Sequence, residues 1–222
     1  MLAKTESVAL IGTEAHLVDV EIDVGQGLPN FSIVGLPAAS VREATHRTRS
    51  AIQSSNEHWP MRRIVANLAP GALRKEGTHF DLALAMGVLT ATDVVNKEHL
   101  NGWVLTGELS LGGSVRPVRG VLAAAISCRK AGRRGIICPR ANADEAALVD
   151  GIEVVPVCTL AECREFANGN WQPDWTPSPP PPPAPDPLDM LDVRGQGGAK
   201  CAIELAAAGG HNVLAFGTET PV

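Results

Sequence analysis

A run of prolines limits how this chain can fold. The stretch PSPPPPPAPDP occupies residues 177–187 of the 222-residue sequence. Proline has no backbone N–H to donate and its ring fixes φ at about −65°, so this stretch cannot form a helix interior or a central strand. Together with the residues before it, the run predicts an extended, polyproline-like linker over residues 169–187. A ligand for a proline-recognition domain is the alternative, and a spacer is the preferred interpretation.

The residues before the linker alternate between strand and helix patterns. Short apolar stretches bounded by turn residues predict strands near residues 5–11, 15–24, 31–35, 62–70, 103–111, 135–139 and 152–157. Apolar residues at helical spacing predict helices near residues 40–55, 79–92, 119–131, 141–149 and 159–168. This alternation predicts a layered α/β (α+β) domain over residues 1–168, with antiparallel strands at its start.

The residues after the linker, 188–222, form the start of a second unit. We predict a helix near residues 196–208, ended by the glycine pair at 209–210, and a strand at 212–216. A helix this short is marginal on its own. We expect it to lack most of its packing surface.

The end of the chain resembles the approach to a phosphate-binding loop. A P-loop reads G-x-x-x-x-G-K-[ST], in which backbone N–H groups and the lysine hold phosphate and the hydroxyl holds Mg²⁺. Gly217 occupies the first position, but Val222 stands where the second glycine belongs and no lysine follows. We therefore expect the 222-residue chain to have no complete nucleotide site, no cofactor and no nucleotide hydrolysis through this loop.

The composition favours a cytoplasmic protein without a membrane segment or a metal site. No apolar run approaches the roughly 18 residues that a membrane-spanning helix needs, and the N-terminus has too short an apolar run for a signal peptide. No cysteine forms a C-x-x-C pair, and no histidine lies at ligand spacing from another histidine or a cysteine. We expect reduced and mostly buried thiols at Cys128, Cys138, Cys158, Cys163 and Cys201.

The net charge of −5 conceals an uneven distribution of charge. Residues 41–75 hold seven Arg or Lys against two acids, and residues 116–140 hold seven against none, so the rest of the chain carries −17. Charge sorted in this way predicts a basic surface for a polyanion such as DNA. The alternative is that both segments are helices whose arginines face solvent. For residues 129–134, the C-terminus of a helix favours cations whatever the function.

Ten basic residues are the candidates for contacts with DNA phosphates. Aromatic residues make up 4% of the chain and Tyr is absent, so few side chains are available for stacking on bases. We therefore expect any contact to be non-specific and salt-sensitive. The candidates are Arg42, Arg49, Arg62, Arg63, Arg74, Lys75, Arg129, Lys130, Arg133 and Arg134.

The polar stretch RKEGTH at residues 74–79 leads into a predicted helix. Free N–H groups at the start of a helix can bind an anion. Nearly every helix offers such groups, so we prefer the interpretation of solvated charges at a helix start. Glu108 and the turn after it are interpreted as turn chemistry, because one carboxylate alone is no catalytic signal.

Four stretches resemble the ComM/YifB family of Mg-chelatase-like AAA+ ATPases. They read GLPNFSIVGLPAASVREATHRTRSAI, RRIVANLAPGALRKEGTHFDLALAMGVL, LTGELSLGGSVRPVRGVLAA and DVRGQGGAKCAIELAAAGGHN. The resemblance implies a Lon-protease-like two-layer domain with a mixed sheet, followed at residues 188–222 by the truncated start of a Mg-chelatase-type AAA+ domain. It also implies that complete members bind ATP and Mg²⁺, form hexamers and resemble helicases that drive DNA branch migration in natural transformation.

The resemblance to Lon introduces a peptidase as a rival function. The Lon family uses a serine nucleophile and a lysine base. In the stretches quoted above, His79 stands at the serine position and Leu122 at the lysine position. Leucine cannot accept a proton, so we expect no peptidase activity.

These observations favour a non-catalytic module that assists ring assembly or guides DNA beside an ATPase domain. The expected partners are DNA and further copies of the chain, and no membrane is involved. An oligomerisation or partner-docking module without DNA binding is the first alternative. A chelatase motor subunit acting on a tetrapyrrole is the second, and the Lon-like domain argues against it.

Overall fold

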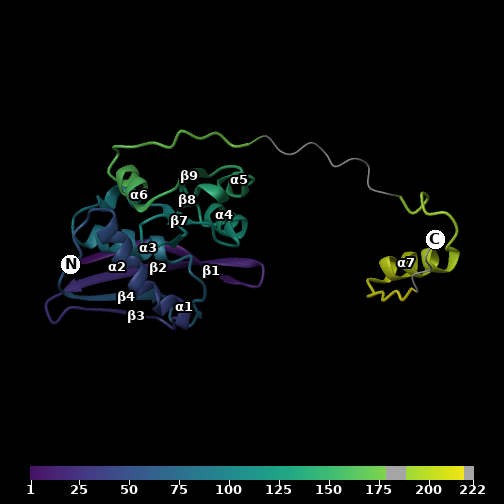
Figure 1. Ribbon diagram of the computed structural model, residues 1–222, viewed down its shortest axis with the longest axis horizontal. Coiled ribbons are helices and arrows are strands. Elements are labelled where there is room, and N and C mark those ends of the chain that lie inside the picture. The colour runs from purple at the N-terminus through teal and green to yellow at the C-terminus, as the bar shows by residue number, and fades with distance from the viewer. Residues whose placement is uncertain (179–188, 218–222) are drawn as a thin grey trace. The chain divides into compact units, whose positions relative to one another are not determined.

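The computed structural model describes residues 1–178 and 189–217 (Figure 1). These residues belong to two compact units that separate near residue 178. Residues 179–187 of the predicted linker and the predicted loop positions 218–222 lie outside the described residues. All of the strands that the structure describes belong to the first unit.

A seven-stranded sheet organises the first unit, in the order β3-β4-β2-β1-β5-β8-β9. Its strands are β1 (Leu2–Ile11), β2 (Glu14–Gly25), β3 (Asn30–Val34), β4 (Arg63–Ala69), β5 (Trp103–Leu105), β8 (Gly135–Pro139) and β9 (Glu153–Val157). β2 pairs antiparallel with both β1 and β4, and the other neighbours pair in parallel. The expected mixed sheet with an antiparallel opening hairpin is therefore confirmed, and β2 alone runs against the other strands.

Helices build a separate core on each face of the sheet. The first core contains residues of α1 (Ala39–Arg42), α2 (Ala44–Ser54), α3 (Asp81–Ala91) and α6 (Leu160–Ala167). The second contains residues of α4 (Val121–Lys130) and α5 (Ala143–Ala146). Alternate strand residues face the two cores, since Trp103 and Leu105 of β5 join the first and Val104 joins the second. The second core contains no described residue of β3 or β4. At these two strands the domain therefore has the expected two layers, which are the sheet and the helices of the first core.

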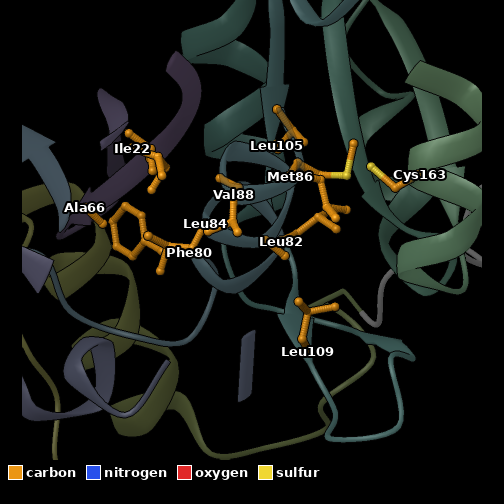
Figure 2. Packing of buried hydrophobic residues seen from close by; sticks show 14 of the residues in the cluster. Ile22, Ala66, Phe80, Leu82, Leu84, Met86, Val88, Leu105, Leu109 and Cys163 are labelled. Carbon is orange, nitrogen blue, oxygen red and sulfur yellow. The ribbon is translucent and has the colours of Figure 1, made fainter. Parts of the chain in front are cut away.

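Helix α3 lies at the centre of the first core. All eleven of its residues are buried, as expected of a helix that is apolar on every side. Figure 2 shows its side chains among those of Ile22 and Ala66 from the sheet and Cys163 from α6. A Cβ atom at Gly87 would lie 2.6 Å from Cγ1 of Ile22, so α3 approaches β2 as closely as only glycine permits.

Some predicted elements of the first unit are divided or shortened in the structure. The predicted helix over residues 40–55 is interrupted at Glu43, between α1 and α2. The predicted strand 103–111 ends at Leu105 and resumes as β6 (Glu108–Leu109), which forms a hairpin with β7 (Val115–Arg116) across the predicted turn. The break falls at Gly107, whose φ of +156° takes the chain out of the main sheet. The predicted helix 141–149 is reduced to the 3₁₀ turn η2 (Arg140–Asn142) and α5; a second 3₁₀ turn, η1 (Lys97–Leu100), precedes β5.

Residues 169–178, assigned to the linker by composition, pack against the first unit. Trp171 contacts the first core and Trp175 the second. The backbone N–H and the hydroxyl of Ser178 donate hydrogen bonds to Asp144, at 3.1 and 2.8 Å. The first unit therefore continues to residue 178.

The second unit contains α7 (Gly197–Gly209), close to the predicted bounds, and none of the residues of α7 is buried. Gly210 ends the helix in the left-handed conformation, with φ of +63°. The predicted strand at 212–216 is wrong, because residues 211–217 form neither a helix nor a strand. A strand needs a neighbour for its backbone hydrogen bonds, and the described part of this unit provides none.

The thiols are mostly buried, as expected. Cys128, Cys138 and Cys163 are buried, Cys158 and Cys201 are exposed, and all five are free. Burial raises the pKa of Cys128 to about 11 and that of Cys138 to about 12. These two thiols therefore stay protonated at neutral pH and are poor nucleophiles.

The described part of the chain contains neither a membrane-spanning helix nor a cluster of metal ligands. There, no helix combines the length and the apolar character that crossing a bilayer requires. Within the same residues, no three His, Cys, Asp or Glu side chains come together as metal ligands would.

Candidate nucleic-acid interface

The two positions that we expect to correspond to the Lon catalytic pair carry a buried imidazole and a hydrocarbon side chain. His79 lies just before α3 with 6% of its surface exposed. Its ring lies 4.4 Å from that of Phe80, and its Nε2 atom has no hydrogen-bond partner among the described residues. Burial lowers the pKa of His79 to about 4, so the imidazole is neutral at pH 7. Leu122 in α4 is 36% exposed and has no group that accepts a proton.

The start of α3 is already occupied by a carboxylate of the chain itself. Asp81 is fully buried and accepts two hydrogen bonds from Arg47 of α2, at 2.6 and 2.9 Å, and one from the N–H of Leu109 at 3.1 Å. Burial raises the pKa of Asp81, and the Arg47 guanidinium opposes that rise. Close by, Glu108 accepts a hydrogen bond of 2.6 Å from the hydroxyl of Thr78. These two carboxylates favour the interpretation of residues 74–79 as a helix start over that of an anion site.

Lys75 points into the protein. It is fully buried, and its ammonium group donates hydrogen bonds to the carbonyl oxygens of Gly35 and Pro70. Burial lowers the pKa of Lys75. Its contacts join the loop after β3 to the loop after β4. This corrects the expectation that Lys75 faces DNA, because a side chain held in this way cannot reach a phosphate at the surface.

Three further candidates are paired with acids. Arg133 makes a bidentate pair with Glu6, at 2.6 and 2.9 Å, and Arg134 pairs with Glu153 at 3.1 Å while lying 4.9 Å from the centre of the Trp103 ring. Arg74 pairs with Glu76 at 2.7 Å. Sequence reasoning missed the pair between Arg133 and Glu6 because the two residues lie 127 positions apart. Pairing reduces the net charge that these arginines offer to a phosphate.

Six candidates are exposed and have no acidic group within 4 Å among the described residues. They are Arg42, Arg49, Arg62, Arg63, Arg129 and Lys130. Arg42 and Arg49 project from α1 and α2, which cover the first core, whereas Arg129 and Lys130 end α4 over the second core. The sheet therefore separates Arg42 and Arg49 from Arg129 and Lys130.

A hollow beside α2 was not indicated by the sequence. This α2 hollow has a volume of about 210 Å³ and is lined by Pro29, Asn30, Phe31, Thr45, His46, Arg49, Trp59 and Met61. The rings of Phe31 and Trp59 lie 5.5 Å apart within it, tilted by 48°. An aromatic pair beside an exposed arginine is suited to stacking and to phosphate contact together. The low aromatic content of the chain concealed this local concentration.

Comparison with known protein families decides the affiliation of the chain. The family described as subunit ChlI of Mg-chelatase matches residues 20–142, more than half of the chain. A second family, described as magnesium chelatase, subunit ChlI, matches residues 189–220. The chain belongs to the ComM/YifB family of ChlI-like proteins. In this ComM/YifB chain, the two family matches lie on either side of the proline-rich run.

Individual relatives agree with this affiliation. The chain is 39% identical over 221 residues to competence protein ComM of Haemophilus influenzae, covering 97% of this chain and 43% of ComM. It is 37% identical over 209 residues to the uncharacterized protein YifB of Escherichia coli, covering 94% of this chain and 41% of YifB. The chain thus spans less than half the length of these relatives.

A shorter match connects the ComM/YifB chain with Lon proteases. Lon protease 2 of Bacillus subtilis is 33% identical over 95 residues, which cover 42% of this chain and 17% of the protease. Together with the mixed sheet and its helices, this match supports the expected Lon-like α/β fold.

Proposed function

We propose that this chain is the non-catalytic N-terminal module of a ComM-like AAA+ ATPase that acts on DNA in the cytoplasm during natural transformation. In this role it guides DNA or assists ring assembly while the ATPase domain of the whole protein drives branch migration. The observation that carries the proposal is the set of exposed arginines without acidic partners in the described residues, on a fold whose Lon-type positions hold His79 and Leu122. The name of the relative ComM, a competence protein, supports the connection with transformation.

The absence of catalysis in this chain is part of the proposal. A Lon-type reaction needs a nucleophile and a base that exchange a proton. Here the first position is a buried, neutral imidazole and the second is a leucine. Incubation of the purified chain with unfolded protein substrates tests this, and peptide cleavage above the buffer blank would contradict it.

Nucleotide chemistry is not assigned to these 222 residues. Gly217 is followed by TETPV, in which Val222 stands where the second glycine of a P-loop belongs. The residues present therefore do not fit a complete nucleotide site, and no step through ATP is derived. In the proposal, ATP and Mg²⁺ bind to the ATPase domain of the whole protein.

A salt titration tests the DNA half of the proposal. Anisotropy of a labelled oligonucleotide measures its affinity for the chain as salt is raised from about 50 to 200 mM, and log K falls linearly with log[salt] if phosphates are neutralised. We expect weak binding with a clear salt slope. If the chain does not bind the oligonucleotide at the lowest salt concentration, the role in guiding DNA is contradicted and the role in ring assembly remains.

One observation favours the second candidate, an oligomerisation or partner-docking module without DNA binding. No residue of α7 is buried, and its Leu205 and Ile203 are 67% and 45% exposed. Exposed apolar residues on a helix are typical of a surface that is covered by another protein or domain. Light scattering tests this candidate, because it predicts a dimer or ring, and a monomer at all concentrations would count against it.

A further inference from the structure

The α2 hollow is formed by segments that are distant in the sequence. Phe31 belongs to β3, Trp59 and Met61 belong to the loop before β4, and the opposite side is formed by α2. β3 pairs in parallel with β4, and the N–H of Asn30 donates a hydrogen bond of 3.4 Å to the carbonyl of Arg62. The pairing of β3 with β4 therefore holds Phe31 and the loop before β4 beside α2. The walls of the hollow are formed by the folded first unit.

The hollow offers an apolar surface to a planar ligand. Trp59 is only 6% exposed and supports the half-buried ring of Phe31, whereas Met61 is 61% exposed at the side of the hollow. Aromatic rings and a thioether both make favourable contacts with flat π systems. Every nucleobase has such a π face, so stacking of this kind is tolerant of sequence.

The charge around the hollow is positive because the nearby acids are directed to other arginines. Glu43 lies 3.9 Å from Arg47, and Glu57 pairs with Arg164 of α6. In the described residues no acid remains within 4 Å of Arg42, Arg49 or Arg62. His46 is also exposed and lies between Arg42 and Arg49 on the outer side of α1 and α2.

We infer that the α2 hollow receives a base of single-stranded DNA whose phosphates lie against Arg42, Arg49 and Arg62. The inference rests on the proposed function and adds the strandedness and the location of the contact. A base in a duplex is paired and stacked, whereas a single strand can turn a base out toward a protein. The surface at the end of α4 is different, because the hollow beside Lys130 is lined by aliphatic and polar side chains and the imidazole of His16.

Two double variants of equal charge compare the two surfaces. Arg49→Gln with Arg62→Gln changes the α2 side, and Arg129→Gln with Lys130→Gln is the matched control on α4. We expect the α2 variant to bind a labelled oligothymidylate of about 15 nucleotides on the order of tenfold more weakly, with a salt slope reduced by about 1.4 for two lost phosphate contacts. The α4 variant should bind as the unchanged chain does.

Two substitutions in the hollow test the base contact. Phe31→Leu keeps an apolar side chain but removes the ring, so we expect weaker oligothymidylate binding with an unchanged salt slope. Trp59→Phe keeps a ring, so binding should persist while the quenching of tryptophan emission by the oligonucleotide decreases. A thermal melt followed by circular dichroism shows that each variant is folded, and an unlabelled duplex should compete less well than a single strand of the same length.

The outcomes separate the inference from the proposed function. If the unchanged chain binds no DNA, the DNA half of the proposed function fails and the inference fails with it. If the chain binds DNA and the α4 variant alone loses affinity, the proposed function stands and the inference is overturned. The base contact is overturned if Phe31→Leu has no effect or if the duplex competes equally. A change of oligomeric state in the α2 variant, with DNA affinity retained, would assign the surface to a second copy of the chain instead.

Discussion

The two basic segments of this chain look alike in sequence and differ in structure. Residues 41–75 and 116–140 each hold seven Arg or Lys. In the first segment, Lys75 is buried and Arg47 is directed to the buried Asp81, so these cations hold the loops around α3 together. In the second segment, Arg133 and Arg134 pair with acids at the surface or close to it. The difference shows that a count of charges does not identify an interface until the contacts of each side chain are known.

The largest expected effect on stability concerns the buried partner of Arg47. Arg47→Met leaves the carboxylate of Asp81, which is fully buried, without its guanidinium. Breaking a buried ion pair from one side costs about 3–5 kcal/mol, so we expect the free energy of unfolding to fall by that amount in urea denaturation. Arg49→Met, two residues away and exposed, is the control and should change stability by less than about 0.5 kcal/mol. Equal stability of both variants would show that the pair between Arg47 and Asp81 does not stabilise the first segment.

A pH dependence of stability is expected from His79. Its pKa in the folded state is about 4, below the ordinary value of 6.5, so the unfolded chain takes up a proton first as the pH falls. The stabilising contribution is complete above pH 6.5 and is lost between pH 6.5 and about 4, by about 3 kcal/mol in total. Urea denaturation at several pH values measures it, and the same titration of His79→Leu should lack this component. A variant with an unchanged pH profile would contradict the burial of His79.

Removal of the Lys75 side-chain contacts should have an intermediate effect. Lys75→Met fills a similar space but leaves the carbonyl of Gly35 without its donor, whereas the carbonyl of Pro70 keeps a hydrogen bond of 3.3 Å from the N–H of Leu73. A buried polar group without a partner costs about 1–3 kcal/mol, so we expect a loss of about 2 kcal/mol in the free energy of unfolding. DNA affinity should stay unchanged. A loss of DNA binding without a loss of stability would show that Lys75 contacts DNA.

The smallest effect is expected in the second segment. Arg133→Gln removes a bidentate pair in which the arginine side chain is 36% exposed. Pairs of this kind contribute about 0–1 kcal/mol, and salt weakens them. We expect the unfolding free energy to fall by less than about 1 kcal/mol, with less loss in high salt. A loss comparable with that of Arg47→Met would remove the distinction between the two segments.

The sequence predicted most elements of the first unit but did not predict the direction of individual side chains. The apolar run that includes Leu82, Leu84 and Met86 predicted α3, because an uninterrupted apolar helix must be buried. The strand at residues 135–139 was predicted with its observed bounds because turn residues surround it. The proline run begins close to the end of the first compact unit. Two tryptophans before the run pack against the cores of that unit, which therefore continues to residue 178.

The features that were missed depend on contacts between distant residues. One of the two acceptors of Lys75 is the carbonyl of Gly35, 40 residues away, and no local pattern indicates this contact. Phe31 and Trp59 meet only because β3 pairs in parallel with β4. The predicted strand at 212–216 had a suitable apolar pattern, but pattern alone does not provide a neighbouring strand.

The central claim is that exposed arginines on the α2 side, and not those at the end of α4, form the contact with DNA. The most direct measurement is the salt dependence of oligothymidylate affinity for the two double variants, Arg49→Gln with Arg62→Gln and Arg129→Gln with Lys130→Gln. A slope reduced by about 1.4 in the first variant alone is the expected result. A reduced slope in the second variant, with the first unchanged, would contradict the account.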